Sequence, residues 1–408
     1  MNTTPAQNAP RGHGLLILEL DGAGSHPAAW RLSRTDPASV LDPAHLRGAV
    51  LAAESAGFHA ATFSDPGLPD TALPDPALPD PALSDPDLPD TDHPAPDAPA
   101  RLNALQRAAF AAPVTRTLAL IPEVDTVYTE PFHLSTQLAS LDYVSGGRAG
   151  WLVAASSSAA DAAAVGRDTV RGELLSREAA DSIEVSRRLW DSWEDGAVIR
   201  DVPTGRYLDV DKLHYIDVEN GSYSVKGPSI IPRPPQGQLP VLVPAGLLTP
   251  EAVAAGAADA LLASAPTPEL LAAELAATRA GLAAGGSGPA LIAELDVVLD
   301  SRGQSAAERL DGLNRHAAWQ SPRARFVGTA AELTELLTDV LAWADGVRLH
   351  PAVLETDHEE LSRLVLPELR RRGLLAPTIP DATFREQLGL ARPASRYAAA
   401  ASAPGTEN

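Results

Sequence analysis

The sequence predicts an α/β fold, a (β/α)8 TIM barrel with insertions, and two observations lead to this prediction. Short apolar segments alternate eight times with longer segments of helical period along the 408 residues, as in parallel strands joined by helical crossovers. No Gly-x-Gly-x-x-Gly motif follows the first apolar segment, which favours a closed barrel over an open dinucleotide-binding sheet. One barrel accounts for the length, although about 150 residues per domain would also allow two or three domains.

Eight segments are expected to form the strands of the barrel. Each is short, rich in aliphatic residues and bounded by turn-forming or polar residues. These segments are residues 14–20, 58–64, 117–122, 149–154, 240–244, 258–264, 290–299 and 346–350.

Helices are expected between these strands. The first of them has the start signals of a helix, because Asp42 can cap it and Pro43 suits its first turn. The expected helices are residues 43–56, 131–142, 172–193, 249–256, 268–283, 306–318, 330–343 and 357–372.

The predicted barrel is a single domain over residues 14–396, with flexible termini at 1–13 and 397–408. Residues 195–239 interrupt the alternation with turn residues and short polar segments, and Glu219-Asn-Gly-Ser222 has the composition of a hairpin turn. We therefore expect a hairpin-containing insertion there.

A second insertion is expected at residues 66–100, where the composition changes sharply. From Asp65 to Asp97 the chain has nine aspartates and no lysine or arginine, and eleven prolines occur up to Pro99. Proline at this density removes the backbone donors that helices and sheets need, so a disordered low-complexity loop is expected. Nine of the 21 net negative charges lie here, which leaves about twelve for the barrel.

Composition excludes several classes of function. A net charge of -21, from 32 basic and 53 acidic residues, repels the phosphate backbone of nucleic acids and anionic membrane surfaces. The sequence has no cysteine, so disulfides and thiolate sites are excluded. Its ten histidines form no His-x-His or His-Glu-x-x-His pair, so no metal site is expected. We expect a cytoplasmic protein, because residues 1–13 lack a signal-peptide core and no apolar run reaches about 20 residues.

Candidate functional residues follow the strands, since the chemistry of such barrels lies at the carboxyl ends of their strands. His26 follows the first expected strand, Asp65 the second, Thr126, Tyr128 and Glu130 the third, and Ser156 the fourth.

Three of these residues also have structural interpretations. His26 precedes Trp30 by four residues and could be a packed loop pair, and Glu130 directly before Pro131 could complement the dipole of a helix start. The serine run from Ser156 to Ser158 could hold a phosphate or cap the next segment. The chain contains no Gly-x-Ser-x-Gly elbow and no Walker loop. A barrel without such a catalytic group usually depends on a cofactor.

Several ordered blocks resemble the bacterial-luciferase-like flavin monooxygenases, in the branch of nitrilotriacetate, pristinamycin and dibenzothiophene-sulfone monooxygenases. The main block runs from Tyr128 to Trp151 and includes Thr-Glu-Pro-Phe-His, Leu-Asp-Tyr and Ser-Gly-Gly-Arg-Ala-Gly-Trp. The similarity extends from His26 to about Arg396. The other blocks are 189–195 with 205–209, 223–228 with 232–237, and 365–373 with 383–390.

The resemblance implies an FMN-dependent monooxygenase of a two-component system. A separate NAD(P)H-dependent flavin reductase would supply reduced FMN, and O2 would oxidise a small organic substrate. The resemblance also implies a homodimer or homotetramer. The catalytic side chains would be His26, Tyr128 and Glu130, and the FMN contacts would be Asp65, Thr126, Leu152, Ser156, Ser176, Gly246 and Leu247.

The chain departs from the family pattern at four residues of the FMN site that the resemblance implies. Leu152 replaces an asparagine, Ser176 replaces a tyrosine, and Leu247-Leu248 replace two serines that bind the phosphate. Each lost hydrogen bond to a charged group removes about 1.5–3 kcal/mol of binding free energy. The alternative function is therefore a non-catalytic paralogue with a degenerate flavin site that acts as a binding protein. A flavin-independent hydrolase lacks the required nucleophile or metal cluster.

Overall fold

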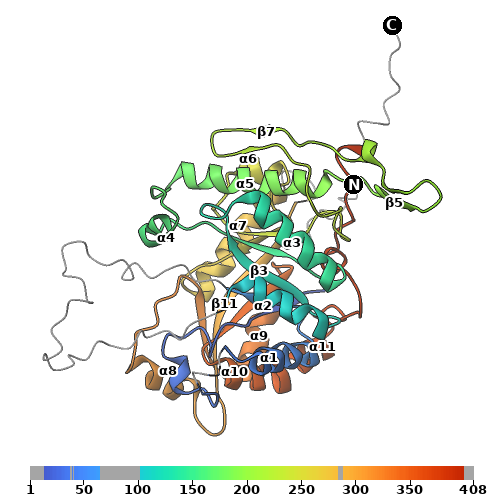
Figure 1. Cartoon of the computed structure of the whole chain (residues 1–408). Helices are drawn as coiled ribbons and strands as arrows, with labels where there is room; N and C mark the ends of the chain where they lie inside the picture. The colour runs from blue at the N-terminus through green and yellow to red at the C-terminus, as the bar shows by residue number, and fades with distance from the viewer. Residues whose placement is uncertain (1–12, 37–38, 40, 65–101, 284–287, 399–408) are drawn as a thin grey trace, which may run out of the picture.

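Eight parallel strands close into a barrel in the computed structural model, which describes residues 13–36, 39, 41–64, 102–283 and 288–398 (Figure 1). The barrel closes because the last strand, β13 (Gly346–Pro351), pairs in parallel with the first, β1 (Leu15–Glu19). The predicted barrel is confirmed. The remaining strands, in spatial order from β1 to β13, are β2 (Ala60–Phe63), β3 (Ala119–Asp125), β4 (Trp151–Ala154), β9 (Val241–Pro244), β10 (Ala260–Ala263) and β11 (Ala290–Leu299).

Helices surround the strands (Figure 1). α1 begins as expected, since the Asp42 carboxylate accepts a hydrogen bond of 2.8 Å from the Ala44 N–H, and it ends at Gly57. The helices are α1 (Pro43–Ala56), α2 (Ala104–Ala111), α3 (Pro131–Ser145), α4 (Ala159–Ala164), α5 (Glu173–Asp191), α6 (Pro250–Ala254), α7 (Pro268–Ala283), α8 (Ala306–Asn314), α9 (Ala330–Leu341), α10 (Leu354–Glu360), α11 (Leu366–Arg371) and α12 (Phe384–Gln387).

Four elements were not expected from the sequence. The helices α2, α4 and α12 are short and alanine-rich or polar, so they carry little helical periodicity. The strand β12 (Ala324–Gly328) pairs with β11 outside the barrel. The last expected helix begins at Leu354 and contains a π-helical stretch, Leu361–Val365, between α10 and α11.

Residues 195–239 contain two small antiparallel sheets, β5 (Val198–Asp201) with β6 (Arg206–Leu208) and β7 (Val218–Glu219) with β8 (Ser224–Val225). The turn expected at residues 219–222 joins β7 to β8, where the Asn220 side chain accepts hydrogen bonds from the N–H groups of Ser222 and Tyr223. The insertion expected at 66–100 lies outside the described residues, as do residues 1–12 and 399–408 of the expected termini.

The strands pack apolar side chains on both faces. Their outer faces join the helices in a large core, whereas their inner faces form a smaller cluster inside the barrel. Phe384 and Leu388, which lie at and just beyond α12, belong to the inner cluster together with the first residues of several strands, such as Leu15 and Ala119. The C-terminal segment therefore closes the amino-terminal end of the barrel and leaves the carboxyl ends of the strands for function.

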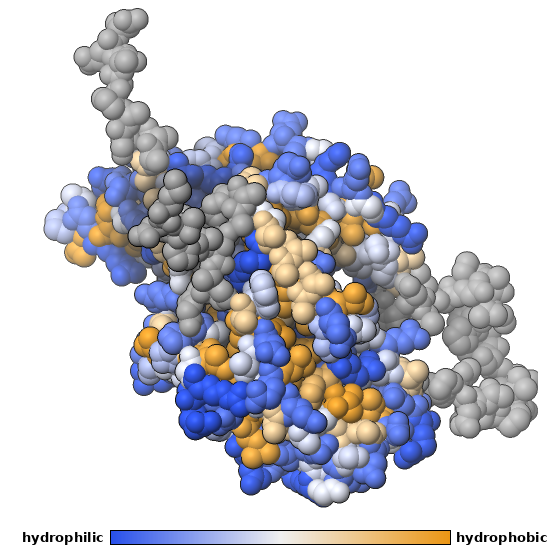
Figure 2. Space-filling model, turned by 180° about the vertical axis from the view of Figure 1, so that it is seen from behind, coloured by the Kyte–Doolittle hydropathy of each residue, from blue (hydrophilic) through white to orange (hydrophobic). Residues whose placement is uncertain are grey.

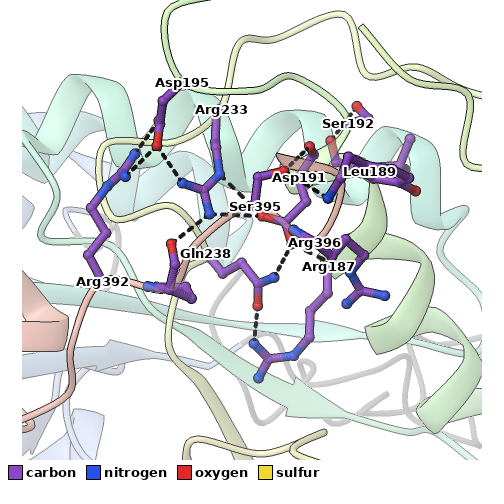
Figure 3. Close-up of polar contacts among 12 residues, drawn as sticks. Arg187, Leu189, Asp191, Ser192, Asp195, Arg233, Gln238, Arg392, Ser395 and Arg396 are labelled. Carbon is purple, nitrogen blue, oxygen red and sulfur yellow. Dashed lines mark hydrogen bonds and ion pairs between the residues drawn. The ribbon is translucent and has the colours of Figure 1, made fainter. Parts of the chain in front are cut away.

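A network of hydrogen bonds and ion pairs surrounds the end of α5 (Figure 3). Asp191 accepts hydrogen bonds from Arg233 at 3.0 Å and from Gln238 at 2.6 Å, and its backbone carbonyl accepts one from Ser395. Arg187 donates to Gln238 in turn. The network joins α5 to the segment before β9 and to the C-terminal segment.

The surface is mostly hydrophilic at the outline of the face in Figure 2, and hydrophobic residues lie toward its middle. Among the helices that the structure describes, none combines the length and apolar character needed to span a bilayer.

Candidate functional site

The mouth of the barrel, at the carboxyl ends of the strands, carries polar side chains above an apolar interior. Alternate residues of a strand face the same side of a sheet. Because Ile121 of β3 belongs to the inner apolar cluster, Glu123 and Asp125 face the interior two and four residues farther along, toward the mouth. Glu123 is in register with Leu152 of β4, which also belongs to that cluster.

Thr126 and Tyr128 lie directly after β3. Thr126 is fully buried, and its hydroxyl donates a hydrogen bond of 2.9 Å to the Ala154 carbonyl, which joins the ends of β3 and β4. The Tyr128 hydroxyl accepts a hydrogen bond from the Val170 N–H at 3.3 Å, so its own hydrogen is available to another acceptor.

Asp125 organises this loop. One carboxylate oxygen accepts hydrogen bonds from the N–H groups of Val127 at 2.8 Å and Tyr128 at 2.7 Å, and the other accepts one from the Ser156 N–H at 2.5 Å. Burial raises the pKa of Asp125 despite these donors. The carboxylate thus fixes the positions of two predicted site residues, Tyr128 and Ser156.

The predicted FMN contacts on and after β4 and β9 lie on the two barrel strands that follow β3 in the spatial order. Leu152 is buried within the barrel, and the Ser156 hydroxyl donates to Asp161 at 2.6 Å. Gly246 follows β9 with a φ of +84°, and a Cβ there would meet open space. Leu247 packs against the outer core.

Ser176, the predicted contact on α5, is half-buried and lies two residues before Glu178. Glu178 pairs with Arg167 at 2.6 Å and is 3.4 Å from the hydroxyl of Tyr223 in the β7–β8 hairpin. That hydroxyl also donates to the Thr126 carbonyl at 2.9 Å. Burial and the Glu178 charge raise the pKa of Tyr223, which keeps its proton. The hairpin is thereby held against the end of β3.

His26, in the loop after β1, has its contacts with Ala28, Asn314 and Trp319. His26 is buried, and its Nδ1 accepts a hydrogen bond from the Ala28 N–H at 2.9 Å. Its Nε2 therefore carries the proton and lies 3.1 Å from Oδ1 of Asn314. The ring contacts Trp319 edge to face with centroids 5.2 Å apart, and burial lowers the pKa of His26. Both ring nitrogens thus have partners in the protein, Nδ1 within its own loop and Nε2 at the end of α8.

Glu130, predicted as a catalytic residue, has a structural role. Glu130 is exposed and caps α3, where its carboxylate accepts hydrogen bonds from the N–H groups of Phe132 and His133 at 3.0 and 2.7 Å. Asp65 lies outside the described residues.

The structure also reveals a charged cluster inside the barrel that sequence reasoning missed. Arg348 of β13 lies between two buried carboxylates. Its Nη1 donates to Glu294 of β11 at 2.9 Å, and its Nε and Nη2 both donate to Glu19 of β1. His350 lies 3.2 Å from the same Glu294 oxygen that accepts from Arg348.

Hydroxyl groups complete the pairing of the two carboxylates. Thr62 and Ser64 each donate to Glu19 at 2.6 Å, and Ser264 donates to Glu294 at 2.6 Å. Burial opposes the ionisation of both carboxyls, but Arg348, His350 and the hydroxyl donors outweigh it. The pKa of Glu19 is about 2, and the pKa of Glu294 is far below its usual range.

Glu123 is the third carboxyl of this cluster and has a different environment. Its Oε2 lies 3.9 Å from Nη2 of Arg348, beyond hydrogen-bond distance. Burial and the negative charges of Glu19 and Asp21 raise the pKa of Glu123 to about 7, although Arg348 and Ser64 act in the opposite direction. Glu123 can therefore exchange a proton near neutral pH.

A sequence signal could have identified the cluster. Charged residues are almost never fully buried unless they are paired, yet Glu19, Glu294 and Arg348 stand inside otherwise apolar strands, Leu-Leu-Ile-Leu-Glu, Ala-Glu-Leu and Val-Arg-Leu. In the described part of the chain, no group of three or more His, Cys, Asp and Glu side chains is arranged to hold a metal ion.

Comparisons with known proteins agree with this architecture. A model of the luciferase-like monooxygenase family matches residues 23–352. The chain is 29% identical over 360 residues to the N-acetyl-S-(2-succino)cysteine monooxygenase of Bacillus subtilis, which covers 70% of this chain and 81% of that protein. It is 43% identical over 140 residues to nitrilotriacetate monooxygenase component A of Aminobacter aminovorans, which covers 34% and 30% of the two chains.

The fold is shared with solved structures of low sequence identity. A long-chain alkane monooxygenase superposes with a TM-score of 0.74 over 93% of this chain and 96% of that one, at 18% identity. Dibenzothiophene-sulfone monooxygenase and a pristinamycin IIA synthase subunit are also among the similar proteins, so the resemblance inferred from the sequence blocks is confirmed.

Proposed function

The chain belongs to the luciferase-like monooxygenase family, and on this premise we propose that it uses reduced FMN and O2 to oxidise a small organic substrate at the barrel mouth. The family match carries the proposal, because it covers the strand ends of β2 to β13 and the loops that follow most of them. A separate NAD(P)H-dependent flavin reductase would supply the reduced FMN, and we propose a cytoplasmic location, where NAD(P)H is available. One relative is itself named as component A of its monooxygenase, which supports a two-component system.

The side chains at the mouth fit a flavin. The Tyr128 hydroxyl keeps a hydrogen to donate, and Leu152 of β4 belongs to the apolar interior below the mouth. Open space beside Gly246 allows a group to approach the backbone of the β9–α6 loop. We propose that the ring lies along β3 and β4 near Thr126 and that the phosphate lies between Ser176 and the β9–α6 loop.

When bound, reduced FMN would supply the electrons that activate O2. The chain's own residues would orient the ring and keep water away from it. Asp125 holds the loop that presents Tyr128, and Tyr223 fixes the hairpin beside it through the Thr126 carbonyl. The contacts of His26 and Glu130 support loop anchoring and helix capping.

Binding of flavin tests the proposal directly. Purified protein is titrated with FMN and with photoreduced FMN, and binding is followed by flavin fluorescence and by calorimetry. We expect reduced FMN to bind with a Kd below about 0.1 mM, which corresponds to more than about 5 kcal/mol. If neither form binds up to about 1 mM, or about 4 kcal/mol, the flavin assignment is wrong.

A second candidate function, a flavin-free binding protein on the same barrel, is favoured by two observations. The Thr126 and Ser156 hydroxyls already donate to the protein, and Leu247 and Leu248 pack with the outer core. The double variant Leu152→Asn with Leu247→Ser separates the two functions. Tighter FMN binding by the variant supports a weakened flavin site, whereas unchanged absence of binding supports a remodelled pocket.

A further inference from the structure

We propose that Glu123 is the proton donor of the oxidation at the barrel mouth. This inference rests on the proposed function and adds a residue to it. Glu123 comes from the carboxyl end of β3 and faces the interior, where a substrate and a flavin would meet.

Exposure distinguishes Glu123 from the other carboxyls of the cluster. Its side chain is 27% exposed, whereas those of Glu19 and Glu294 are 5% and 12% exposed. Glu19 and Glu294 accept hydrogen bonds from Arg348 and from hydroxyl groups deeper in the barrel. Glu123 is therefore the carboxyl that a molecule in the mouth can reach.

The charge balance explains why this carboxyl would hold a proton. The single guanidinium of Arg348 lies between two ionised carboxylates. Burial and the Arg348 charge lower the pKa of the neighbouring His350, so its imidazole is neutral near pH 7 and the cluster already carries a net charge of -1. Ionisation of Glu123 would add a second uncompensated negative charge in a partly buried site.

Among the described residues that face Glu123, no further cation compensates the charge that its ionisation would add. Asp21 adds a negative charge from the loop after β1 and pairs with Arg107 at 2.9 Å. Ser64 of the β2 end is neutral, and Leu152 in the adjacent strand is apolar. Consistent with this geometry, the pKa of Glu123 is about 7.

The proposed step balances in atoms and charge. A substrate, O2, singly ionised reduced FMN and one proton give the substrate with one added oxygen atom, oxidised FMN and water. One oxygen atom forms a bond to the substrate, and the O–O bond breaks. The second oxygen atom leaves as water after it takes the proton from the Glu123 carboxyl. Without a substrate, the same proton would complete hydrogen peroxide. Water at the mouth then reprotonates Glu123, since its side chain is partly exposed.

The first test needs no flavin. Infrared difference spectra of the unloaded protein are recorded as the pH is raised from 5 to 9. We expect a protonated carboxylic acid band that is lost near pH 7 in the wild-type protein and is weaker in Glu123→Gln, where Asp142, whose pKa burial raises to about 6, still contributes. Circular dichroism and thermal unfolding establish that the variant folds. An identical band in a folded Glu123→Gln would show that another carboxyl carries this proton and would overturn the proposal.

The second test measures the proton step with photoreduced FMN and O2. Reoxidation of bound flavin is followed in the wild-type protein, Glu123→Gln and Glu123→Asp, after the FMN affinity of each has been measured. We expect the wild-type rate to fall as the pH rises through about 7. We expect Glu123→Gln to be slower by at least about 10²-fold at pH 6 and independent of pH, and Glu123→Asp to retain a pH-dependent rate.

The outcomes separate the two proposals. If wild-type protein fails to bind reduced FMN, the proposed function is wrong. If Glu123→Gln binds FMN normally and keeps the wild-type rate and pH profile, the flavin function stands and the role of Glu123 is overturned. Glu335→Gln is the matched control, because Glu335 lies on the exposed surface of α9 and pairs only with Arg372 at 2.6 Å among the contacts described.

Discussion

At the scale of single residues, Glu123 makes the stability of the protein depend on pH. Its pKa is about 7 in the folded chain, compared with an ordinary value of 4.5. The folded state therefore keeps a proton that the unfolded chain releases. The free energy of unfolding should fall as the pH rises from about 4.5 to about 7 and then stay constant with respect to this group.

Replacement of Glu123 by glutamine should remove this dependence. We expect Glu123→Gln to match the wild type within about 0.5 kcal/mol at pH 4.5. At pH 8 we expect it to be more stable by about 2–3 kcal/mol, somewhat less than the shift alone gives at 1.36 kcal/mol per pH unit, because the side chain is partly exposed. Urea unfolding at the two pH values measures the difference. An equal effect of the substitution at both pH values would contradict the assignment.

Gly150 lies where the surrounding side chains leave no room for a larger residue. A Cβ at this residue would lie 2.7 Å from Cε1 of Phe384 and 3.3 Å from Cγ1 of Ile121. Both neighbours are fully buried, so neither can move freely. We expect Gly150→Ala to lower the free energy of unfolding by about 1–3 kcal/mol. The control is Gly48→Ala in α1, where a Cβ meets nothing within 4 Å, and it should stabilise the helix by up to about 1 kcal/mol.

At the scale of elements, the end of α5 depends on a buried ion pair. Arg233 and Asp191 have side chains only 2% and 1% exposed, and they contact each other at 3.0 Å (Figure 3). Removal of one partner leaves the other charge buried without compensation. Because Arg233 also donates to the Pro393 carbonyl, its loss should also remove one of the contacts that hold the C-terminal segment near α5.

The substitution Arg233→Ala should therefore lower the free energy of unfolding by about 3–5 kcal/mol. Limited proteolysis should cut the segment after α12 sooner than in the wild type. The control is Arg392→Ala, since Arg392 is 44% exposed and pairs with the exposed Asp195, which predicts a loss below about 1 kcal/mol. Similar losses for the two variants would show that burial of the pair is unimportant.

The β9–α6 loop decides how the phosphate of a flavin would be held. Leu248 is 7% exposed and Leu247 packs beside it against the outer core, so neither offers a donor to a phosphate. We expect the Kd values of FMN and riboflavin to differ by a factor below about 10, which is a difference in binding free energy below about 1.4 kcal/mol. Leu247→Ser should increase this ratio. Parallel titrations with the two flavins measure it, and a ratio above about 10² in the wild type would show that other groups bind the phosphate.

At the scale of the whole molecule, the alternation of apolar and helical segments was sufficient to predict the barrel. All eight barrel strands lie within or beside the expected segments because their apolar residues pack on both faces. The charged cluster was not predicted, since Glu19 and Arg348 are distant in sequence and meet only when β13 pairs with β1. The use of both His26 nitrogens likewise depends on Asn314, which arrives from α8.

The topology of the barrel also predicts what the acidic segment contributes. In the chain order, α2 follows β2 and leads into β3, so one strand–helix–strand unit is complete without residues 66–100. The two sides of the segment are close, because Arg107 of α2 donates to the Ser64 carbonyl and Leu102 lines a pocket together with Leu20. A short linker, at up to about 3.5 Å per residue, can therefore join Asp65 to Arg101.

We propose that residues 66–100 are dispensable for folding. Their replacement by six glycine and serine residues removes eight aspartates and changes the net charge from -21 to -13. We expect the shortened chain to unfold cooperatively with a Tm within about 3 °C of the wild type, which for a domain of this size is about 2 kcal/mol or less. A shortened chain that binds reduced FMN as the wild type does would show that the segment also takes no part in the flavin site. A loss of cooperative unfolding would show instead that the acidic segment belongs to the folded domain.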